Sequence, residues 1–222
     1  MVNKAISTNT IERLMVYANY LRSLSEPPQH ISATSIAEQL GLNHVVVRKD
    51  LAGVSDGGRP KVGYETIRLL ADIEHALGYD NPRNAVIVGA GNLGRALMRY
   101  DGFKTYGMQI AMAFDADETM IGCSFGNVPV RPVAELENTV KDMDIHIGII
   151  TVPAAAAQAI CDRLISCRIK AIWNFAPVKL AVPPQVMVRN ENMAVSLALL
   201  SQHLSGAKDS GDAAGDVPTD KA

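Results

Sequence analysis

The chain has 222 residues, of which 48% are apolar, and a formal net charge of −2 at pH 7. That length suits one large domain or two small ones, and a nearly neutral chain shows no bulk attraction to nucleic acid or to a membrane surface. No apolar run reaches the roughly 18 residues of a membrane helix, and the N-terminus has no apolar run suited to a signal peptide. The three cysteines, Cys123, Cys161 and Cys167, show neither CxxC spacing nor a paired histidine. We therefore expect a soluble, cytoplasmic protein with reduced thiols and no metal site.

The first 80 residues predict a small helical domain. Apolar side chains recur at helical spacing over four segments, residues 9–24, 35–40, 44–53 and 65–78. The predicted N-caps are Asn9, Ser35 in a Ser-x-x-Glu capping box, and Asn43, and Gly41 and Gly78 are predicted to end two of the helices. The glycine-rich segment 53–64 follows the third helix and predicts a hairpin. Three helices followed by a hairpin is the order of a winged helix-turn-helix.

Basic side chains gather on the third helix and the hairpin. Arg48 and Lys49 lie on the helix after a glycine turn, and Arg59 and Lys61 follow in the hairpin. Arginine and lysine neutralise phosphates, and arginine also reads guanine in the major groove. The position after a capped helix and a turn favours DNA binding, although a solvated helix face in a small helical domain would give the same pattern.

A different pattern begins after a linker at residues 79–84. Apolar strands alternate with helices, which indicates a parallel sheet with crossover helices. The predicted strands cover residues 85–89, 108–115, 144–153 and 170–177, the predicted helices cover 92–100, 154–167 and 192–204, and residues 127–136 lead to a helix or loop. The fold class is therefore α/β, and the predicted divisions are 1–80 for the winged helix, 84–190 for a Rossmann-like domain, 191–205 for a last helix, and 206–222 for a disordered acidic tail.

The sequence NAVIVGAGNLGRAL at residues 84–97 predicts a dinucleotide site. Gly89-Ala90-Gly91-Asn92-Leu93-Gly94 fits GxGxxG between a strand and a helix. The three glycines would permit a tight turn, approach of the pyrophosphate and close contact of helix and strand. Asp115 ends the next strand and would accept hydrogen bonds from an unmodified ribose, which favours NAD(H) over NADP(H). A glycine turn that binds nothing is the alternative. Two later strand ends, residues 151–153 and 174–177, fit the other half of such a site.

The chain shows no set of catalytic side chains. His146 lies inside an apolar strand, His203 near the end of the last helix and His44 on the predicted DNA-binding helix, and none has an evident aspartate or serine partner. A dehydrogenase would need an acid or base and a substrate pocket beyond the dinucleotide site. We therefore expect a regulator that is not an enzyme, with an NAD-dependent oxidoreductase as the less favoured alternative.

These motifs occur together in one known family. A winged helix with VRKDL and VGY, followed by GAGNLGRAL, FDAD, TVPAAAAQ and NFAP, resembles the Rex family of redox-sensing transcriptional repressors over about residues 5 to 205. The resemblance implies a homodimer in which the last helix swaps into the partner subunit. It also implies binding to inverted-repeat operators on double-stranded DNA, with release when NADH replaces NAD⁺.

The resemblance and the motifs together assign site residues. The cofactor-binding residues are Gly89, Ala90, Gly91, Asn92, Leu93, Gly94, Tyr100, Asp115, Thr151, Val152, Pro153, Phe175, Ala176 and Met193. The DNA-binding residues are His44, Arg48, Lys49, Arg59, Lys61 and Tyr64, among which Arg48 and Lys49 match the family's recognition-helix pair. Asn19 and Asn192 stand where the family tends to place an Arg–Asp pair between the N-terminal domain and the swapped helix.

The sequence also departs from the family pattern. The predicted wing, AGVSDGGRPKVGY, lacks the family's aromatic residues and contains a proline, and Val46 stands where the family often has glutamine. The Asn19 and Asn192 positions would replace a charge pair by an amide pair. Met193 aligns with an apolar or aromatic residue near the nicotinamide. An NAD(H)-binding paralogue with altered or lost DNA binding, acting through partner contacts, is therefore the main alternative.

Overall fold

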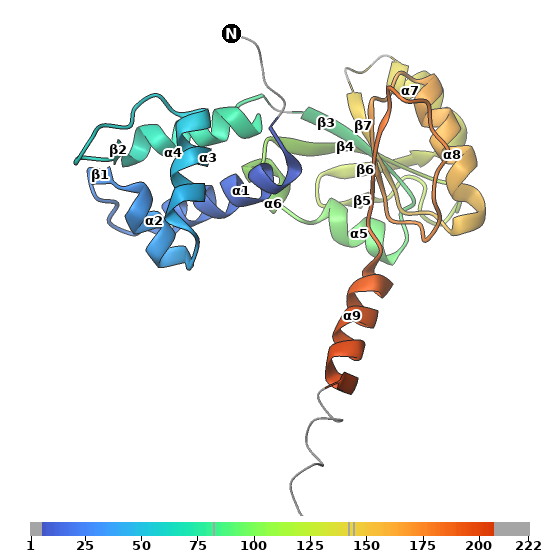
Figure 1. Ribbon diagram of the computed structural model, residues 1–222. Helices are drawn as coiled ribbons and strands as arrows, with labels where there is room; N and C mark the ends of the chain where they lie inside the picture. Colours follow the sequence, from blue (N-terminus) through green and yellow to red (C-terminus); the bar gives the residue numbers. More distant parts are fainter. Residues whose placement is uncertain (1–5, 82, 142, 144, 207–222) are drawn as a thin grey trace, which may run out of the picture. The chain divides into compact units, whose positions relative to one another are not determined.

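A computed structural model of the protein describes residues 6–206 except 82, 142 and 144 (Figure 1). The chain forms two compact units. Unit 1 comprises the chain up to Arg83 together with Asp101–Gln109, and unit 2 comprises Asn84–Tyr100 and the chain from Ile110 onward. The predicted disordered tail beyond residue 206 lies outside the described residues.

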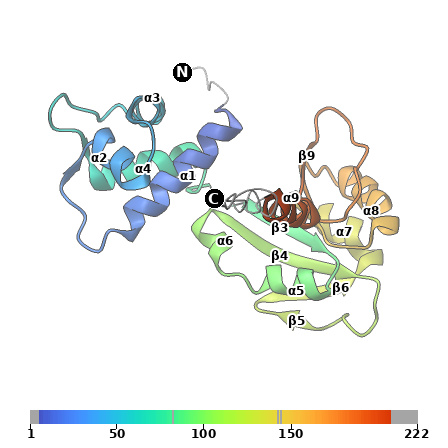
Figure 2. The same cartoon turned by 60° about the horizontal axis from the view of Figure 1, so that its bottom comes forward.

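Unit 1 is built from helices around one apolar core. Its main helices are α1 (Thr8–Ser23), α2 (Ala33–Leu40), α3 (His44–Val54) and α4 (Thr66–Leu77) (Figure 2). The core contains Leu14, Tyr17, Ile36, Leu51 and Ile73, so each of the four helices contributes at least one buried side chain. Two short strands that the sequence did not predict to pair, β1 (His30–Ile31) and β2 (Tyr64–Glu65), form an antiparallel ladder. These elements form the predicted winged helix-turn-helix.

Two of the predicted N-caps are wrong. Helix α1 begins after Ser7 instead of Asn9, because the Ser7 hydroxyl accepts the Thr10 N–H at 3.2 Å. Helix α2 begins after Ser32, whose hydroxyl accepts the Ser35 N–H at 2.9 Å. Both segments contain several serine, threonine or asparagine residues that are able to cap, so composition alone does not choose among them. The predicted cap of α3 is confirmed, since the Asn43 side chain accepts the Val45 N–H at 2.9 Å. Both predicted C-terminal glycines, Gly41 and Gly78, adopt the left-handed conformation.

The wing is shorter than a regular hairpin. Arg59 and Gly63 exchange two backbone hydrogen bonds of 2.9 Å and form a single isolated bridge. The turn between them is made by Pro60 and Lys61, and Lys61 has φ 65°. The glycines at 57 and 58, where the sequence suggested the turn, lie before it. Gly63 has φ 91°, and a Cβ there would overlap the carbonyl oxygen of Ile31, which explains its position beside β1.

Unit 2 contains most of a seven-stranded sheet with the order β5-β6-β4-β3-β7-β8-β9. The strands are β3 (Arg83–Val88), β4 (Met108–Asp115), β5 (Ser124–Phe125), β6 (Val128–Pro132), β7 (Ile145–Ile150), β8 (Ala171–Asn174) and β9 (Met187–Asn190). Strands β3 and β7, β4 and β6, β7 and β8, and β8 and β9 pair in parallel, whereas β5 and β6 pair antiparallel. The four predicted strands are confirmed as elements. Strand β6 lies where a helix or loop was predicted, and β9 was not predicted.

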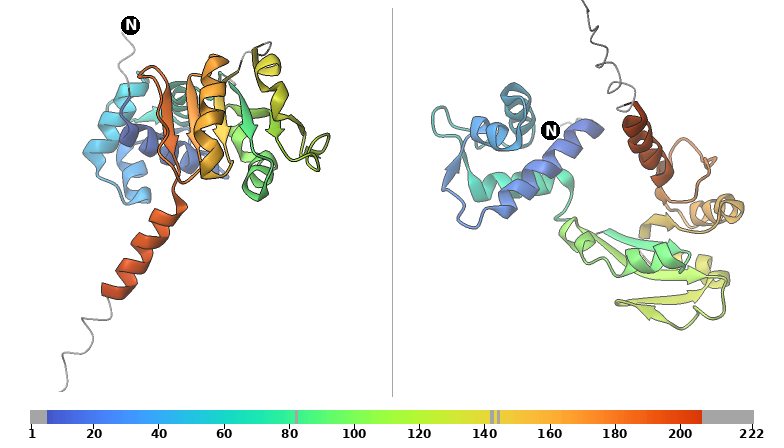
Figure 3. Two further views of the ribbon diagram at one scale, coloured as in Figure 1. Left: turned by 90° about the vertical axis from the view of Figure 1, so that its right-hand side faces the viewer. Right: turned by 90° about the horizontal axis from the view of Figure 1, so that it is seen from below.

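Helices pack on this sheet. Helices α7 (Leu136–Lys141) and α8 (Ala154–Ser166) share a buried cluster with Val86 and Val88 of β3, and Figure 3 shows α8 alongside the strands. Helix α5 (Asn92–Met98) connects β3 to β4. The 3₁₀ turn η1 (Val133–Glu135) precedes α7, and α9 (Met193–Gly206) follows β9. Arg163 holds this arrangement by donating to Glu137 at 2.5 and 2.7 Å and to the Val133 carbonyl at 2.6 Å.

The segment between α5 and β4 belongs to unit 1. It contains α6 (Gly102–Thr105), and no sequence pattern predicts that this segment packs with unit 1. The Arg83 N–H donates to the Gly107 carbonyl at 2.8 Å, and the rings of Tyr79 and Tyr106 meet edge to face at 5.4 Å. Arg22 of α1 donates to the Thr105 carbonyl at 3.5 Å. The linker therefore packs on a segment that lies more than 20 residues later in the chain.

Among the described residues, no helix is long and apolar enough to cross a membrane. The same part of the chain contains no group of three His, Cys, Asp or Glu side chains arranged to hold a metal ion.

Candidate nucleotide pocket and nucleic-acid interface

A cavity of about 350 Å³ opens at the carboxyl ends of β3, β4 and β7. It is lined by residues 88–91, 95, 115–117, 120, 133, 151–153, 156 and 160. Strand β3 lies between β4 and β7, and the sheet extends from β3 in both directions. Ligands of open parallel sheets bind at such a point, outside the carboxyl ends of the strands. The cavity therefore has the position that the sequence predicted for a dinucleotide.

The first glycine of the motif makes the tight turn that the sequence predicted. Gly89 has φ 108°, and a Cβ on it would lie 2.8 Å from the backbone of Thr151. The Thr151 hydroxyl donates to the carbonyl oxygens of Gly89 at 2.8 Å and Val88 at 3.1 Å. A Cβ at Gly94 would overlap the same Gly89 carbonyl, so the predicted close contact of helix and strand is confirmed. These contacts fix the start of α5 against β3 and β7.

Gly91 differs from these two glycines. It is the N-cap residue of α5 with φ −67°, and no atom lies within 4 Å of the position that a Cβ would take. Its backbone lines the cavity. An added methyl group would therefore leave the fold unstrained and occupy space at the cavity wall. An open Cβ position at the cavity wall is expected of a glycine whose missing side chain leaves room for a ligand.

Asp115 ends β4 and joins two loops of the cavity. One carboxylate oxygen accepts the Ala90 N–H, and the other accepts the Asp117 N–H at 2.9 Å. These two bonds fix the orientation of the carboxylate beside the glycine turn. Asp117 lines the cavity too, and a hydrogen bond from the Thr119 side chain lowers its pKa. Both carboxylates would disfavour a 2′-phosphate.

Several predicted cofactor residues do not line the cavity. Asn92, Leu93 and Gly94 lie in the first turn of α5, Tyr100 follows that helix, and Phe175 and Ala176 follow β8. Ala176 is buried, and the fully buried Asn174 beside it donates to the Ala176 and Val178 carbonyls at 3.2 and 2.9 Å. That network shapes the loop after β8. Met193 begins α9, and its side chain lies outside those that the structure describes.

The cavity also contains residues that the sequence did not identify. Arg95 lies on α5 four residues after Gly91, donates to the Asn92 side chain at 2.6 Å and stacks over Phe125 at 5.7 Å. It supplies a cation beside the predicted phosphate position. Its place directly after the glycine motif, in GNLGR, was the sequence feature that could have identified it. Met120, Val133 and Ile160 form an apolar part of the cavity wall. The sequence analysis missed them because they lie far from the glycine motif along the chain.

Helix α3 presents a basic face in unit 1. His44, Arg48 and Lys49 are exposed, whereas Val47 and Leu51 are buried. The buried side contains a polar anchor: Asp50, 7% exposed, accepts two hydrogen bonds from Arg13 of α1 at 2.6 and 2.9 Å. The hydroxyl of Tyr17, also on α1, donates to the same carboxylate at 3.0 Å. Burial raises the pKa of Tyr17 to about 12. This network fixes α3 on α1, so the basic side chains project from a rigid element.

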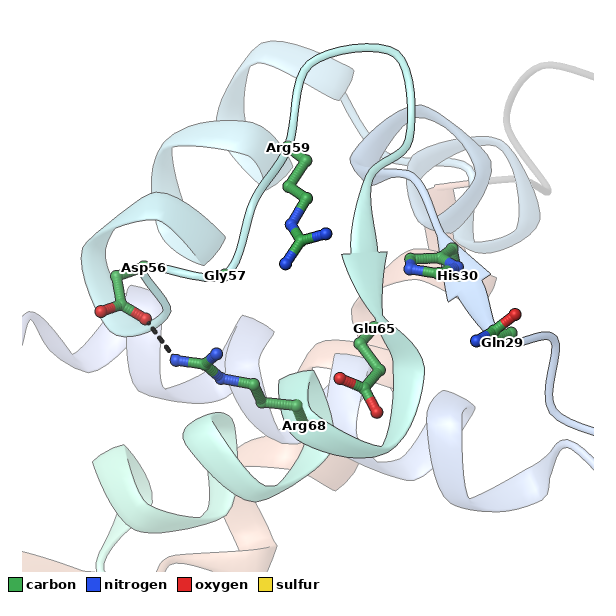
Figure 4. A pocket seen from close by; sticks show the side chains of 7 residues that line it. All are labelled: Gln29, His30, Asp56, Gly57, Arg59, Glu65 and Arg68. Carbon is green, nitrogen blue, oxygen red and sulfur yellow. Dashed lines mark hydrogen bonds and ion pairs between the residues drawn. The ribbon is translucent and has the colours of Figure 1, made fainter.

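The wing supplies the remaining predicted contacts. Arg59 and Lys61 are exposed. Figure 4 shows Arg59 directed into a cavity of about 460 Å³. Asp56 and Arg68 also line this cavity and form an ion pair with each other at 2.8 Å. Tyr64, which we expected to contact DNA, is only 7% exposed, and its ring packs against Gly58. Its place in β2 turns it toward the core of unit 1, so we assign it a structural role.

Two family models match the chain. Residues 5–52 match the model described as "Putative DNA-binding protein N-terminus", and residues 80–178 match the CoA binding domain. A redox-sensing transcriptional repressor Rex from Carboxydothermus hydrogenoformans is 42% identical over 193 residues, which are 86% of this chain and 93% of the relative. The chain belongs to the Rex family.

Solved structures agree with the sequence comparison. A crystal structure of RSP in complex with β-NAD⁺ and operator DNA is 33% identical, covers 95% of this chain and 100% of its own, and gives a TM-score of 0.87. A structure of RSP in complex with β-NADH is 32% identical, covers 92% and 97%, and gives a TM-score of 0.80. A solved relative therefore shares both the winged-helix and the Rossmann-like domain of this Rex-family chain.

The two asparagines of this Rex-family chain have local partners within their own units. Asn19 of α1 is exposed, and its side-chain amide oxygen accepts a hydrogen bond from the Arg22 guanidinium at 3.3 Å. Asn192 precedes α9, and its side chain accepts the Ala194 N–H at 3.1 Å. Each side-chain amide makes a short-range hydrogen bond, and both residues are exposed.

The buried cysteines of this Rex-family chain do not form a reactive centre. Cys161 and Cys167 are free and buried, and burial raises the pKa of Cys161 to about 11 and that of Cys167 in the same direction. Cysteines react as thiolates, so both are protonated and unreactive near neutral pH. His146 belongs to β7. Neither it nor a cysteine lines the candidate nucleotide cavity.

Proposed function

We propose that this chain is a redox-sensing transcriptional repressor that binds operator DNA through unit 1 and NAD(H) through unit 2. The observation that carries the proposal is the cavity beside Gly91 and Asp115 on the same Rex-family chain as the basic face of α3. RSP, a relative that covers nearly the whole chain, has been crystallised with β-NAD⁺ and operator DNA and also with β-NADH. The fit of the cavity and of α3 to these ligands supports carrying both to this protein.

The residues of the cavity suit a dinucleotide. The open side of Gly91 and the free N–H groups of the first turn of α5 would receive the pyrophosphate, with Arg95 as the nearby cation. Asp115 would accept the ribose hydroxyls, and Val152 and Pro153 would supply apolar contact. Tyr100, Phe175, Ala176 and Met193 remain candidates for the nicotinamide side. The bound coenzyme supplies a nicotinamide ring that is positively charged when oxidised and neutral when reduced.

DNA recognition would involve two parts of unit 1. His44, Arg48 and Lys49 of α3 would enter the major groove, with Arg59 and Lys61 of the wing on the backbone. The rigid attachment of α3 through Asp50 and Arg13 supports this assignment, because a reading helix needs a fixed register on the duplex. We assign the coenzyme the role of an effector, because the relatives that this chain matches are redox-sensing transcriptional repressors.

An inverted repeat requires two copies of unit 1. Helix α9 supports a homodimer, because Val195, Leu197, Leu199, Leu200 and Leu204 are 52% to 68% exposed. A helix with so many exposed apolar side chains needs a partner surface. We propose that α9 swaps into the partner subunit, where Asn192 reaches the partner's Asn19. NADH would favour a dimer whose recognition helices do not match the half-site spacing.

The test is a selection of genomic fragments bound by the purified protein, performed once with NAD⁺ and once with NADH. We expect an inverted repeat that is enriched with NAD⁺ and lost with NADH, and no enrichment with Arg48→Ala. The matched control is Arg131→Ala, an exposed arginine of unit 2. An operator held equally with both coenzymes would reject redox sensing. No enrichment under either condition would reject DNA binding and favour a paralogue that acts through other partners.

A further inference from the structure

We propose that Val45 and Val46 of α3 recognise thymine methyl groups in the major groove and so determine which operator this protein selects. The inference rests on the proposed function, because it assigns a reading role within the same DNA-binding face. It concerns two apolar side chains that no basic-patch argument explains.

The two valines are exposed on an otherwise amphipathic helix. Val45 is 60% exposed and Val46 is 38% exposed, while the next valine, Val47, is fully buried. The core side of α3 is therefore complete without them. Val45 stands three and four residues before Arg48 and Lys49, which places the three side chains on one face of the helix.

The position of the valines on α3 suits base contact. The Asn43 side chain accepts the Val45 N–H at 2.9 Å, so both valines belong to the first turn. The first turn of a recognition helix is the part that approaches base edges in the major groove. In the major groove the apolar group that marks a base pair is the C5-methyl of thymine, which only A·T and T·A pairs carry. Valine is stiff about χ1, so a capped first turn would hold its methyl groups in place.

The charge of α3 identifies DNA as the occupant in preference to a protein partner. The exposed charged side chains of this helix, Arg48 and Lys49, are both cationic. Its single acid, Asp50, is buried and engaged by Arg13. A face with cations beside exposed valines fits a polyanion that presents methyl groups between its phosphate rows. The half-exposed valine of α1, Val16, has no such cationic pair one turn away on its own helix.

The experiment removes the methyl group from the DNA without changing its hydrogen-bonding edges. Full-length protein with NAD⁺ first selects its operator from random duplexes, and each thymine of one half-site is then replaced by uracil. We expect at least one replacement to weaken binding about fourfold, the value of one buried methyl group. The same replacement should have little effect on Val45→Ala or on Val46→Ala.

The variants report recognition instead of folding. Alanine favours helix more than valine does, so neither substitution should lower the melting temperature. Val16→Ala makes the same change on α1 and should keep the full response to uracil. The inference is overturned if uracil is neutral at every position, or if it weakens the wild type and both variants equally. If the chain selects no operator, the proposed function and this inference fail together.

Discussion

The hydroxyl of Thr151 donates a 2.8 Å hydrogen bond to the carbonyl oxygen of Gly89 and so joins the end of β7 to the turn after β3. Gly94 of α5 lies against the same carbonyl, with no room for a Cβ. One carbonyl group therefore positions three segments of the candidate nucleotide cavity. Gly91, two residues from it, carries none of this packing.

The two glycines should respond differently to alanine. Gly91→Ala should leave the free energy of unfolding within about 0.5 kcal/mol of wild type, because its Cβ position is open. It should weaken NADH binding at least about tenfold, because the methyl group takes ligand space. Gly94→Ala should cost about 2 kcal/mol through overpacking against Gly89. Calorimetric titration with NADH and urea unfolding separate the two. Normal NADH affinity of Gly91→Ala would remove the dinucleotide from this cavity.

Asp115 should set the preference between coenzymes. Replacing it by serine removes a negative charge beside the glycine turn and keeps a hydroxyl that is able to accept a hydrogen bond. We expect the ratio of NADPH to NADH affinity to rise by about tenfold or more, since both repulsion and ribose contact change. Fluorescence titration with each coenzyme measures the ratio. Asp101→Ser, an exposed aspartate outside the cavity, is the control and should leave the ratio unchanged.

The anchor of α3 should contribute more to stability than an exposed ion pair of the same unit. Asp50→Asn leaves Arg13 and Tyr17 without their charged acceptor, and we expect a loss of about 2 kcal/mol. Asp56→Asn breaks the ion pair with Arg68, in which Asp56 is 89% exposed, and should cost less than about 0.5 kcal/mol. Urea unfolding and hydrogen exchange of α3 give the comparison. Equal losses would show that the Asp50 network does not hold the helix.

Acid should weaken unit 2 through Glu137. Hydrogen bonds from Arg163 lower the pKa of Glu137 from 4.5 to about 2. The pair therefore contributes fully above pH 4.5, and its contribution is lost as the pH falls from there toward 2. Because both side chains are nearly one-third exposed, we expect only about 1 kcal/mol.

The comparison for this pH effect is Glu137→Gln, which should flatten the fall in unfolding free energy between pH 5 and pH 3. Glu135→Gln serves as the control, because Glu135 is half-exposed and its ion pair with Arg131 is longer, at 3.6 Å. That variant should follow the wild-type curve. A wild-type slope retained by Glu137→Gln would assign the acid sensitivity to other carboxyls.

Helix α9 should determine the oligomeric state. Leu197→Asp combined with Leu200→Asp places charge on side chains that are 68% and 64% exposed in one chain. In a monomer both changes would be harmless, whereas in a dimer they would bury unpaired carboxylates. We expect sedimentation equilibrium to show a dimer for the wild type and a monomer for the double variant. A wild-type monomer at all concentrations would reject the swapped helix.

Local rules predicted about half of the residues that line the nucleotide cavity, and also Gly94 behind the glycine turn. Gly89 and Gly94 were predictable because a tight turn and a close helix contact exclude a Cβ, and Asp115 because it ends the next strand. Arg95 was not predicted, although it directly follows the glycine motif in the sequence. Met120 and Ile160 were not predictable, since their approach depends on how distant strands pair, and single-sequence periodicity does not report that pairing.

In unit 1 the failures have equally specific causes. Tyr64 was assigned to DNA with the VGY motif of the predicted wing, yet strand β2 has two residues, too few for alternation to reveal which side faces the core. The segment from residue 7 to 10 offers four possible caps, so Ser7 was missed. Strand β6 contains two prolines, which have no backbone N–H to donate to a neighbouring strand, so its sequence argues against a strand. The place of α6 in unit 1 depends on Tyr79 and Tyr106 meeting, a contact between distant positions.

The return of Asp101–Gln109 to unit 1 means that the backbone passes between the units three times, after residues 83, 100 and 109. A gene fragment ending near residue 83 would therefore encode unit 1 without helix α6. The remaining fragment would contain α6 without the unit on which it packs. Recombination would find no single breakpoint at which to exchange the sensor for another. The nucleotide-binding unit and the winged-helix unit are therefore not separable by a cut at one point of the chain.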